Sequence, residues 1–285
     1  LVRQFLMNAP RFNQWMREKN PATLIMGILN VTPDSFSDGG MYYNATQAIE
    51  FALQMEEEGA DIIDVGGEST RPGAKTVELQ KECDRILPVI EGIRTKSDIL
   101  ISIDTYKSEV ARQSIATGAG MVNDISGMTF DPNMVDVIKD SGLPVVIMHI
   151  KGTPKNMQKN PYYEDLMQEL TEYFEERKKF ARAKGILDQQ IILDPGIGFG
   201  KRLQDNFQLL RELKKIVDMG FPVLIGPSKK SFIGLTLDLP VDQRLEGTAA
   251  AVTTGILKGA RIVRVHDVKE MKRVALITDS IRGIA

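Results

Sequence analysis

Short apolar runs recur along the whole chain. Each run is rich in Ile, Leu and Val and is too short for a helix, which needs at least about ten residues. Both faces of such a run are apolar, as is typical of strands covered on two sides in a parallel sheet. The runs occupy residues 24–29, 62–65, 100–103, 121–122, 145–148, 191–193, 223–225 and 262–265.

The segments between these runs have a helical period. Residues 46–58 gather their apolar side chains on one face, and residues 165–184 do the same with glutamates and lysines on the other face. Gly59 and Gly185 directly follow these two segments. Glycine is favoured just past a helix C-terminus because that position often needs a positive φ. Strand and helix are therefore expected to alternate.

Eight strand–helix units within residues 21–285 predict an α/β fold, the closed (β/α)8 TIM barrel. An open, doubly wound sheet shows the same alternation and is the structural alternative, although the strand count favours the barrel. No linker or repeat divides residues 21–285, so we predict a single catalytic domain. Residues 1–20 are interpreted as an N-terminal lead-in packed on the barrel.

Composition and charge narrow the function classes. Charged residues make up 26% of the 285 residues and the net charge is −2, so no overall basic excess indicates a nucleic-acid partner. No apolar stretch is long enough for a membrane span, and the first residues lack the apolar core of a signal peptide. The single cysteine, Cys83, excludes an internal disulfide framework. These features predict a cytoplasmic protein.

Polar residues stand where each predicted strand ends. In a parallel barrel the loops after the strands form the active-site face, so these residues are expected to meet. One such residue could be a helix cap or a turn residue. A polar group at all eight exits is better explained by a binding site. The exits carry Asn30, Glu68 to Arg71, Asp104, Asn123, His149, Asp194, Ser228 to Ser231, and Arg264 with His266.

The exits mix two kinds of chemistry. Arg71, Lys229, Lys230 and Arg264 supply cations, with His266 as a further candidate, and cations suit a phosphate or pyrophosphate. Acceptors come from Asp104, Asn123 and Asp194, which would be costly to bury unless a ligand brings donors. The combination predicts a nitrogen heterocycle that carries a phosphorylated arm.

Three glycine-rich stretches need separate weighing. Residues 30–40 and 66–73 are long loops with glycine hinges, consistent with mobile lids, although ordinary surface loops are the alternative. Gly196, Gly198 and Gly200 depart from the GxGxxG spacing and precede Lys201, which argues against a dinucleotide site.

Several ordered motifs in residues 24–285 resemble those of dihydropteroate synthases. The sequence MGILNVTPDSFSDGG at residues 26–40 is similar to the family signature, and GGESTRPG at residues 66–73 is similar to its second loop. Further matches are SIDT at residues 102–105, NDI at 123–125, LDPG and GFGK within 193–201, and RVHD at 264–267.

The resemblance implies an activity and its residues. The family condenses 7,8-dihydropterin-6-ylmethyl diphosphate with 4-aminobenzoate, by an SN1-like loss of pyrophosphate, and sulfonamides compete for the aminobenzoate pocket. Mg2+ is the implied cofactor, held in part by Asn30, and a homodimer formed on late outer helices is implied as well. The catalytic candidates are Asp104, Asp194, Lys230, Arg264 and His266. The resemblance implies that the pterin is surrounded by Asp104, Asn123, Met148, Asp194 and Lys230, with Arg264 stacked on it. It implies that the diphosphate lies near Thr70, Arg71, Val265 and His266. It implies that the aminobenzoate pocket is lined by Phe36, Pro72, Phe199 and Ser231.

The chain departs from the family pattern in two places. Residues 228–231 read Ser-Lys-Lys-Ser where the family usually has Ser-Arg-Lys-Ser, so the pterin role is assigned to Lys230 and Lys229 replaces the arginine. Loss of the planar guanidinium weakens the case for a bidentate phosphate contact there. After His149 the chain reads Ile150-Lys151-Gly152 instead of the commoner Met-Gln or Met-Arg, from which we expect no change of reaction.

Three rival functions remain from the residues. Lys230 could be the Schiff-base lysine of an aldolase on the same fold. A pterin-binding methyl carrier of a corrinoid system would share the pterin-facing Asp and Asn residues, but has no use for Thr70-Arg71-Pro72 or Ser231. A catalytically inactive regulatory relative is the third.

Overall fold

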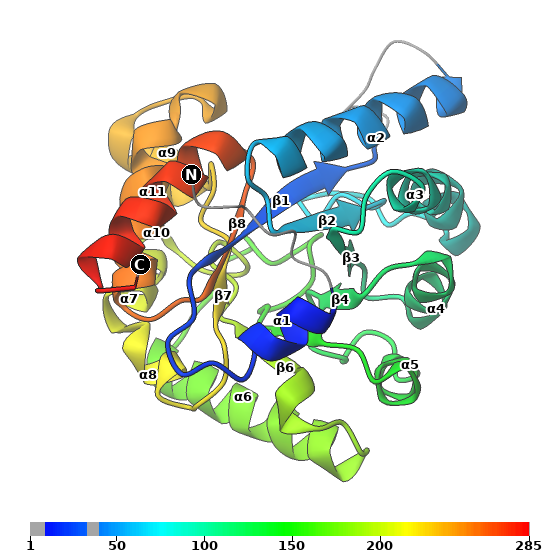
Figure 1. The fold of residues 1–285 in the computed structure, drawn as a ribbon. Helices are drawn as coiled ribbons and strands as arrows, with labels where there is room; N and C mark the ends of the chain where they lie inside the picture. Colours follow the sequence, from blue (N-terminus) through cyan, green and yellow to red (C-terminus); the bar gives the residue numbers. More distant parts are fainter. Residues whose placement is uncertain (1–8, 33–39, 285) are drawn as a thin grey trace.

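The computed structural model describes residues 9–32 and 40–284, and their strands form one parallel sheet (Figure 1). The strand order is β6-β5-β4-β3-β2-β1-β8-β7. A parallel bridge between Leu193 and Val223 joins the two ends of this order, β6 and β7. The sheet therefore closes on itself, which confirms the predicted (β/α)8 barrel and contradicts the open doubly wound alternative. The strands are β1 (Leu24–Asn30), β2 (Ile62–Gly66), β3 (Leu100–Asp104), β4 (Met121–Asp124), β5 (Val145–Met148), β6 (Ile191–Asp194), β7 (Leu224–Ile225) and β8 (Ile262–Val265).

Helices surround this cylinder (Figure 1). The two segments predicted as helices are α2 and α6, although α2 begins earlier than its apolar periodicity indicates. None of the helices in the described ranges is long and apolar enough to cross a membrane. The outer helices are α2 (Gly40–Glu57), α3 (Leu79–Arg94), α4 (Ser108–Thr117), α5 (Met134–Ser141), α6 (Leu166–Ala183), α7 (Leu203–Glu212), α8 (Lys214–Val217), α9 (Ser231–Leu237), α10 (Leu245–Leu257) and α11 (Val268–Ile281).

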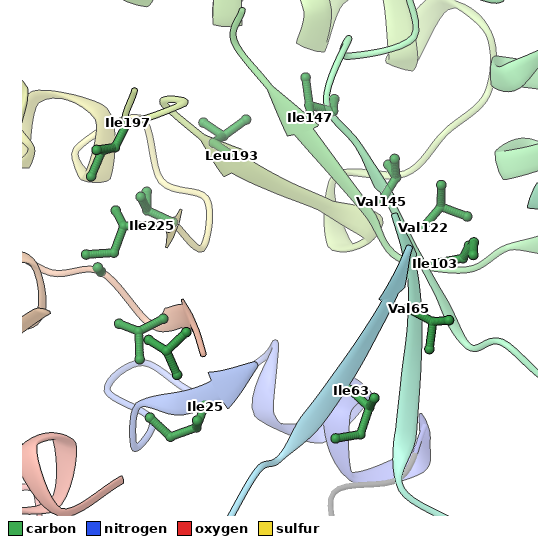
Figure 2. Packing of buried hydrophobic residues seen from close by; sticks show 14 of the residues in the cluster. Ile25, Ile63, Val65, Ile103, Val122, Val145, Ile147, Leu193, Ile197 and Ile225 are labelled. Atoms are coloured by element: carbon green, nitrogen blue, oxygen red, sulfur yellow. The ribbon is translucent and has the colours of Figure 1, made fainter. Parts of the chain in front are cut away.

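Alternate residues of each strand belong to two different cores. One core lies between the sheet and the helices, and Figure 2 shows its strand residues following one another from Ile25 on β1 through Ile103 on β3 to Leu193 on β6. The other core fills the amino-terminal half of the cylinder with Met26, Ile62, Leu100, Met121, Val146, Ile192, Leu224 and Ile262. Since both faces of every strand are covered, the apolar runs of the sequence are explained.

The short helix α1 (Ala9–Trp15) closes the amino-terminal end of the cylinder. Phe12 and Trp15 stack with ring centroids 5.4 Å apart and join the inner core formed by the strand starts. The indole N–H of Trp15 donates to the carbonyl of Ala22 at 2.8 Å, so the ring's one polar group is paired. The sequence left the role of this segment unassigned, and the structure identifies it as a plug.

Phe12→Ala should lower the free energy of unfolding by about 3–5 kcal/mol, because it opens a cavity under a fully buried ring. Fluorescence of Trp15, the single tryptophan, can follow urea unfolding. The control is Phe51→Ala on α2, since Phe51 is 37% exposed. Equal shifts of the two unfolding midpoints would contradict the plug.

Candidate active site

Towards the carboxyl ends of the strands the inner positions change from apolar to polar. Asp64, Asp104, Asn123 and Asp194 all point into the cylinder above the inner core, and each is less than 10% exposed. The strand register places Asp104 beside Gly66 on one side and Asn123 on the other. Polar groups predicted at separate strand exits therefore share one floor.

Arg264 on β8 organises this floor. Its Nε donates to Oδ2 of Asp64 at 2.6 Å, and its Nη2 donates to Oδ2 of Asp104 at 2.8 Å. Asn123 also donates to Oδ2 of Asp64, at 3.0 Å. Burial alone would lower the pKa of Arg264, but the two carboxylates outweigh it and raise that pKa. The guanidinium is thus held charged by carboxylates from two other strands.

The same floor keeps acceptors without partners. Oδ1 of Asp64, Oδ1 of Asp104 and Oδ1 of Asn123 are buried and have no hydrogen bond within the described residues, as is also true of Oγ of Ser102. An unpaired buried polar atom costs roughly 1–3 kcal/mol. A ligand that brings several N–H donors would remove these costs.

Burial also shifts the charges of the floor. It raises the pKa of Asp104 to about 7, an effect that Arg264 opposes and the neighbouring Asp64 strengthens. Asp194 has its pKa raised to about 6, again chiefly by burial, although its Oδ1 accepts the N–H of Gly196 at 2.7 Å. Near neutral pH both carboxyls are close to their titration range and respond to donors on a ligand.

Lys230 follows β7, the neighbour of β6, and its charge interacts with that of Asp194. Burial, followed by the charge of Arg264, lowers the pKa of Lys230 to about 8, while Asp194 and Asp104 oppose the shift. Its Nζ lies 4.1 Å from the ring centroid of Phe199, in a cation–π contact. An ammonium, a carboxylate and an aromatic face therefore converge from the exits of β6 and β7.

A cavity of about 650 Å³ opens above the floor. It is lined by most of the residues predicted for binding, together with Met157, Gln158 and Arg244, which were not predicted from the sequence. The predicted residues that line it are Asn30, Thr70, Arg71, Pro72, Phe199, Lys230, Ser231, Arg264 and His266.

Two expected cations behave differently from the prediction. Burial, together with the charges of Arg264 and Lys229, lowers the pKa of His266 to about 4, so this imidazole is neutral at pH 7. Its Nδ1 lies 3.0 Å from Oγ of Ser228. Lys229 has a φ of 56° and pairs with Asp267 at 2.7 Å, so its charge is already partnered. Among the predicted cations, Arg71 and Lys230 are therefore the ones that line the cavity without an ion pair to a described residue.

The other predicted residues do not line this cavity: Asp104, Asn123 and Asp194 lie in the floor, and three lie elsewhere. Val265 belongs to the core between sheet and helices, so its side chain points away from the cavity and only its backbone can take part. Met148 is buried and stands beside Asp194 in the strand register, within the cylinder. Phe36 and the centre of the first glycine-rich loop fall outside the described residues.

Sequence reasoning missed two buried charged residues. Asp64 interrupts an apolar run, and a carboxylate inside a strand covered on both faces should have indicated a partner. Lys201 is 3% exposed, and its Nζ lies 3.1 Å from Nδ1 of His149. Burial lowers the pKa of Lys201 to about 7. Its place just after Gly200 was noted, but its burial was not predictable from the residues around it.

Asp64→Ala should lower the free energy of unfolding by roughly 3–5 kcal/mol, because it leaves Arg264 with one carboxylate fewer and Asn123 without its acceptor. Urea denaturation measures the change. Glu109→Ala is the control, since Glu109 pairs with Arg112 on the surface and should give no measurable shift. If both variants unfold at the same denaturant concentration, the floor does not depend on Asp64.

Known proteins are similar to this chain in sequence. The model of the family "Pterin binding enzyme" matches residues 26–266. A dihydropteroate synthase of Synechocystis sp. is 50% identical over 260 residues, which is 91% of this chain and 90% of that protein.

Solved structures agree in fold and sequence. The Yersinia pestis dihydropteroate synthase, in a sulfonamide drug complex, has a TM-score of 0.87 and 44% identity, over 92% of this chain and 95% of that chain. The enzyme from Clostridium difficile, in the presence of pteroic acid, has a TM-score of 0.88 and 45% identity, over 93% and 99% of the two chains.

Proposed function

We propose that this chain, which belongs to the family of pterin-binding enzymes and is a dihydropteroate synthase, runs its reaction across the described cavity from an acidic floor to a cationic mouth. It joins 7,8-dihydropterin-6-ylmethyl diphosphate to 4-aminobenzoate and releases pyrophosphate. The observation that carries the assignment of residues is the set of unpaired acceptors on Asp64, Asp104 and Asn123 beneath that cavity.

The pterin ring is the ligand that this floor fits. Its ring and exocyclic N–H groups can donate to the free oxygens of Asp104 and Asn123 and to the carboxylate of Asp194. Lys230 is a nearby donor suited to the ring's carbonyl and bare nitrogen. Arg264, held by Asp64 and Asp104, offers a flat guanidinium on which the ring stacks.

Bond cleavage needs charge stabilisation more than a base. The C–O bond between the methylene and the diphosphate breaks, the ring nitrogens delocalise the cation, and the electron pair leaves with pyrophosphate. Asp104 and Asp194 favour that cation from below. Arg71 meets the leaving diphosphate, while Thr70 and neutral His266 contribute hydrogen bonds. The amine of 4-aminobenzoate then forms the C–N bond and loses a proton to water.

Mg2+ fits the residues at the cavity wall. Asn30 lines the cavity and carries an amide oxygen, a ligand type that Mg2+ accepts. At phosphate sites this ion usually keeps several waters and takes few protein ligands, so one amide is sufficient on the protein side. When bound, Mg2+ supplies positive charge to the departing diphosphate.

The aminobenzoate is assigned to the outer part of the cavity. Pro72 and Phe199 provide apolar walls there, and Ser231, the first residue of α9, provides a hydroxyl. Phe36 is proposed to complete this wall. The same surface would accept a sulfonamide, as the Yersinia pestis enzyme does.

Two rivals fit the cavity less well. A methyl carrier needs only the pterin floor, yet Thr70, Arg71 and Ser231 line the same cavity as Lys230. An aldolase would use Lys230 as a nucleophile, but that ammonium lies between Phe199 and the charged floor, where it serves as a donor to a ring.

A homodimer and a cytoplasmic location complete the proposal. Apolar side chains are exposed on neighbouring α10 and α11, among them Leu257 at 52%, Ile277 at 66% and Ile281 at 70%. A second copy of the chain would cover them. The free, buried thiol of Cys83 is compatible with a reducing compartment.

Incubation with both substrates and Mg2+, followed by mass detection of dihydropteroate, tests the activity. We expect equal amounts of dihydropteroate and pyrophosphate. A covalent adduct on Lys230 after borohydride trapping with a carbonyl substrate, in place of that product, would instead support the aldolase.

Pterin affinity should rise as the pH increases from about 5 to 7.5, because N–H donors bind the ionised forms of Asp194 and Asp104 and must displace their protons at lower pH. Asp104→Asn should weaken binding of a non-reactive pterin by roughly 1.5–3 kcal/mol at the upper end of this range. The variant should also lose the rise in affinity near pH 7, which comes from Asp104. It should keep the rise near pH 6, which comes from Asp194. Calorimetric titration measures both, and an unchanged pH profile in the variant would contradict this placement of Asp104.

A further inference from the structure

The loop between β2 and α3 is held at both ends by one ammonium. Residues 67–78 form this loop, which carries Thr70 and Arg71 to the cavity. Nζ of Lys107 lies 2.6 Å from Oε2 of Glu68 near the start of the loop and 2.6 Å from the carbonyl of Val77 near its end. The two ends are therefore fixed relative to each other.

Glu68 is itself saturated with donors. Its Oε2 also accepts the N–H of Val77 at 2.8 Å, and its Oε1 accepts the hydroxyl of Tyr106 at 2.8 Å. The side chain is 7% exposed and does not line the cavity. Both of its oxygens are therefore occupied by protein donors, although Glu68 lies only two residues from Thr70.

A second carboxylate completes the cluster. Glu82 on α3 is 1% exposed, lies 2.5 Å from Nζ of Lys107 and accepts the hydroxyl of Thr105 at 2.9 Å. Burial raises the pKa of Glu82, and Lys107 opposes the shift. Strand exit, loop and helix are thus bonded through one buried group of charges.

The cluster also connects to the acidic floor. Thr105, Tyr106 and Lys107 directly follow Asp104, whose carboxylate binds Arg264. One chain segment therefore carries both Asp104, which lies in the floor, and the residues that bond the ends of the loop.

Between its anchors the loop has little support of its own. Arg71, Pro72 and Lys75 are exposed, and the backbone bonds in this part are Ala74 N–H to Arg71 O and Gly73 N–H to Pro154 O, both 3.0 Å. The orientation of Thr70 and Arg71 must then come mainly from the ends. Buried ion pairs contribute little net stability but fix geometry when every partner is satisfied.

We propose that Glu68, Glu82 and Lys107, the anchor cluster, are positioning residues that hold Thr70 and Arg71 against the leaving diphosphate. This role rests on the proposed function. It predicts that damage to the cluster slows turnover while the pterin floor still binds its ring.

Lys107→Met keeps the length of the side chain and removes its charge. We expect kcat to fall roughly 10–100-fold, as misplacement of a catalytic group by about 1 Å can do, while the affinity for a non-reactive pterin changes less than about twofold. Trypsin should cleave after Lys75 faster than in the wild type, because loosened anchors expose the loop. Lys107→Arg should restore part of kcat, and Arg71→Ala marks the loss expected when the loop's own cation is absent.

Lys272→Met is the matched control. Lys272 pairs with Asp61 at 2.8 Å just before the opposite end of β2, with both side chains less than 20% exposed. Its loss removes a comparable ion pair far from the loop. We expect lower stability, but wild-type kcat and wild-type cleavage after Lys75.

Lys107→Met leaves two buried carboxylates without their ammonium, so Glu68→Gln provides a milder variant if the first does not fold. The proposal is overturned if the folded variants keep wild-type kcat, or if they lose pterin affinity as much as turnover. Unchanged cleavage of the loop in these variants also overturns it. If the wild type forms no dihydropteroate, the proposed function fails, whereas the cleavage and pterin-binding comparisons still report on the anchors.

Discussion

The charge balance around Arg264 is the constraint on which the site depends. One guanidinium is shared by Asp64 and Asp104, and both pairs are possible because β8 pairs with β1 and the curvature of the barrel brings Arg264 within reach of β2 and β3. Two carboxylates against one cation leave a floor that is still acidic and still has free lone pairs. A buried floor of this kind is costly when empty, and it favours a ligand that is cationic or rich in donors.

The mouth of the cavity carries basic residues, but their positive charge is only partly free. Lys229 is neutralised by Asp267 and His266 is uncharged, so less positive charge is free there than a count of basic residues indicates. Arg71 is exposed and Lys230 lies deeper, beside Phe199. The site therefore separates its charges by depth: the acceptors and Arg264 lie below, the half-buried Lys230 lies between, and the exposed Arg71 lies above. This order suits a substrate whose ring is bound before its diphosphate departs.

The barrel was predictable from the sequence because strands that are buried on both faces consist of short runs of Ile, Leu and Val. The sequence also predicted which exits are polar, since the carboxyl ends of parallel strands must share one edge. It could not predict partners. Arg264 and Asp64 are 200 residues apart, and Lys229 and Asp267 are 38 apart. Their pairing therefore depends on how the strands are arranged in the barrel and not on the local sequence pattern. The neutral state of His266 and the plug formed by Phe12 and Trp15 depend on burial for the same reason.

Strand β3 links the two halves of the chemistry. Its last residue, Asp104, meets Arg264 in the floor, and the next three residues supply the bonds that hold Glu68 and Glu82. A shift of this strand end would move the ring site and the loop that carries Arg71 together. The relative placement of the bound ring and its leaving group is then set by backbone geometry, which is stiff, and less by the exposed loop itself. A barrel suits this arrangement because each strand end is braced by its neighbours on both sides.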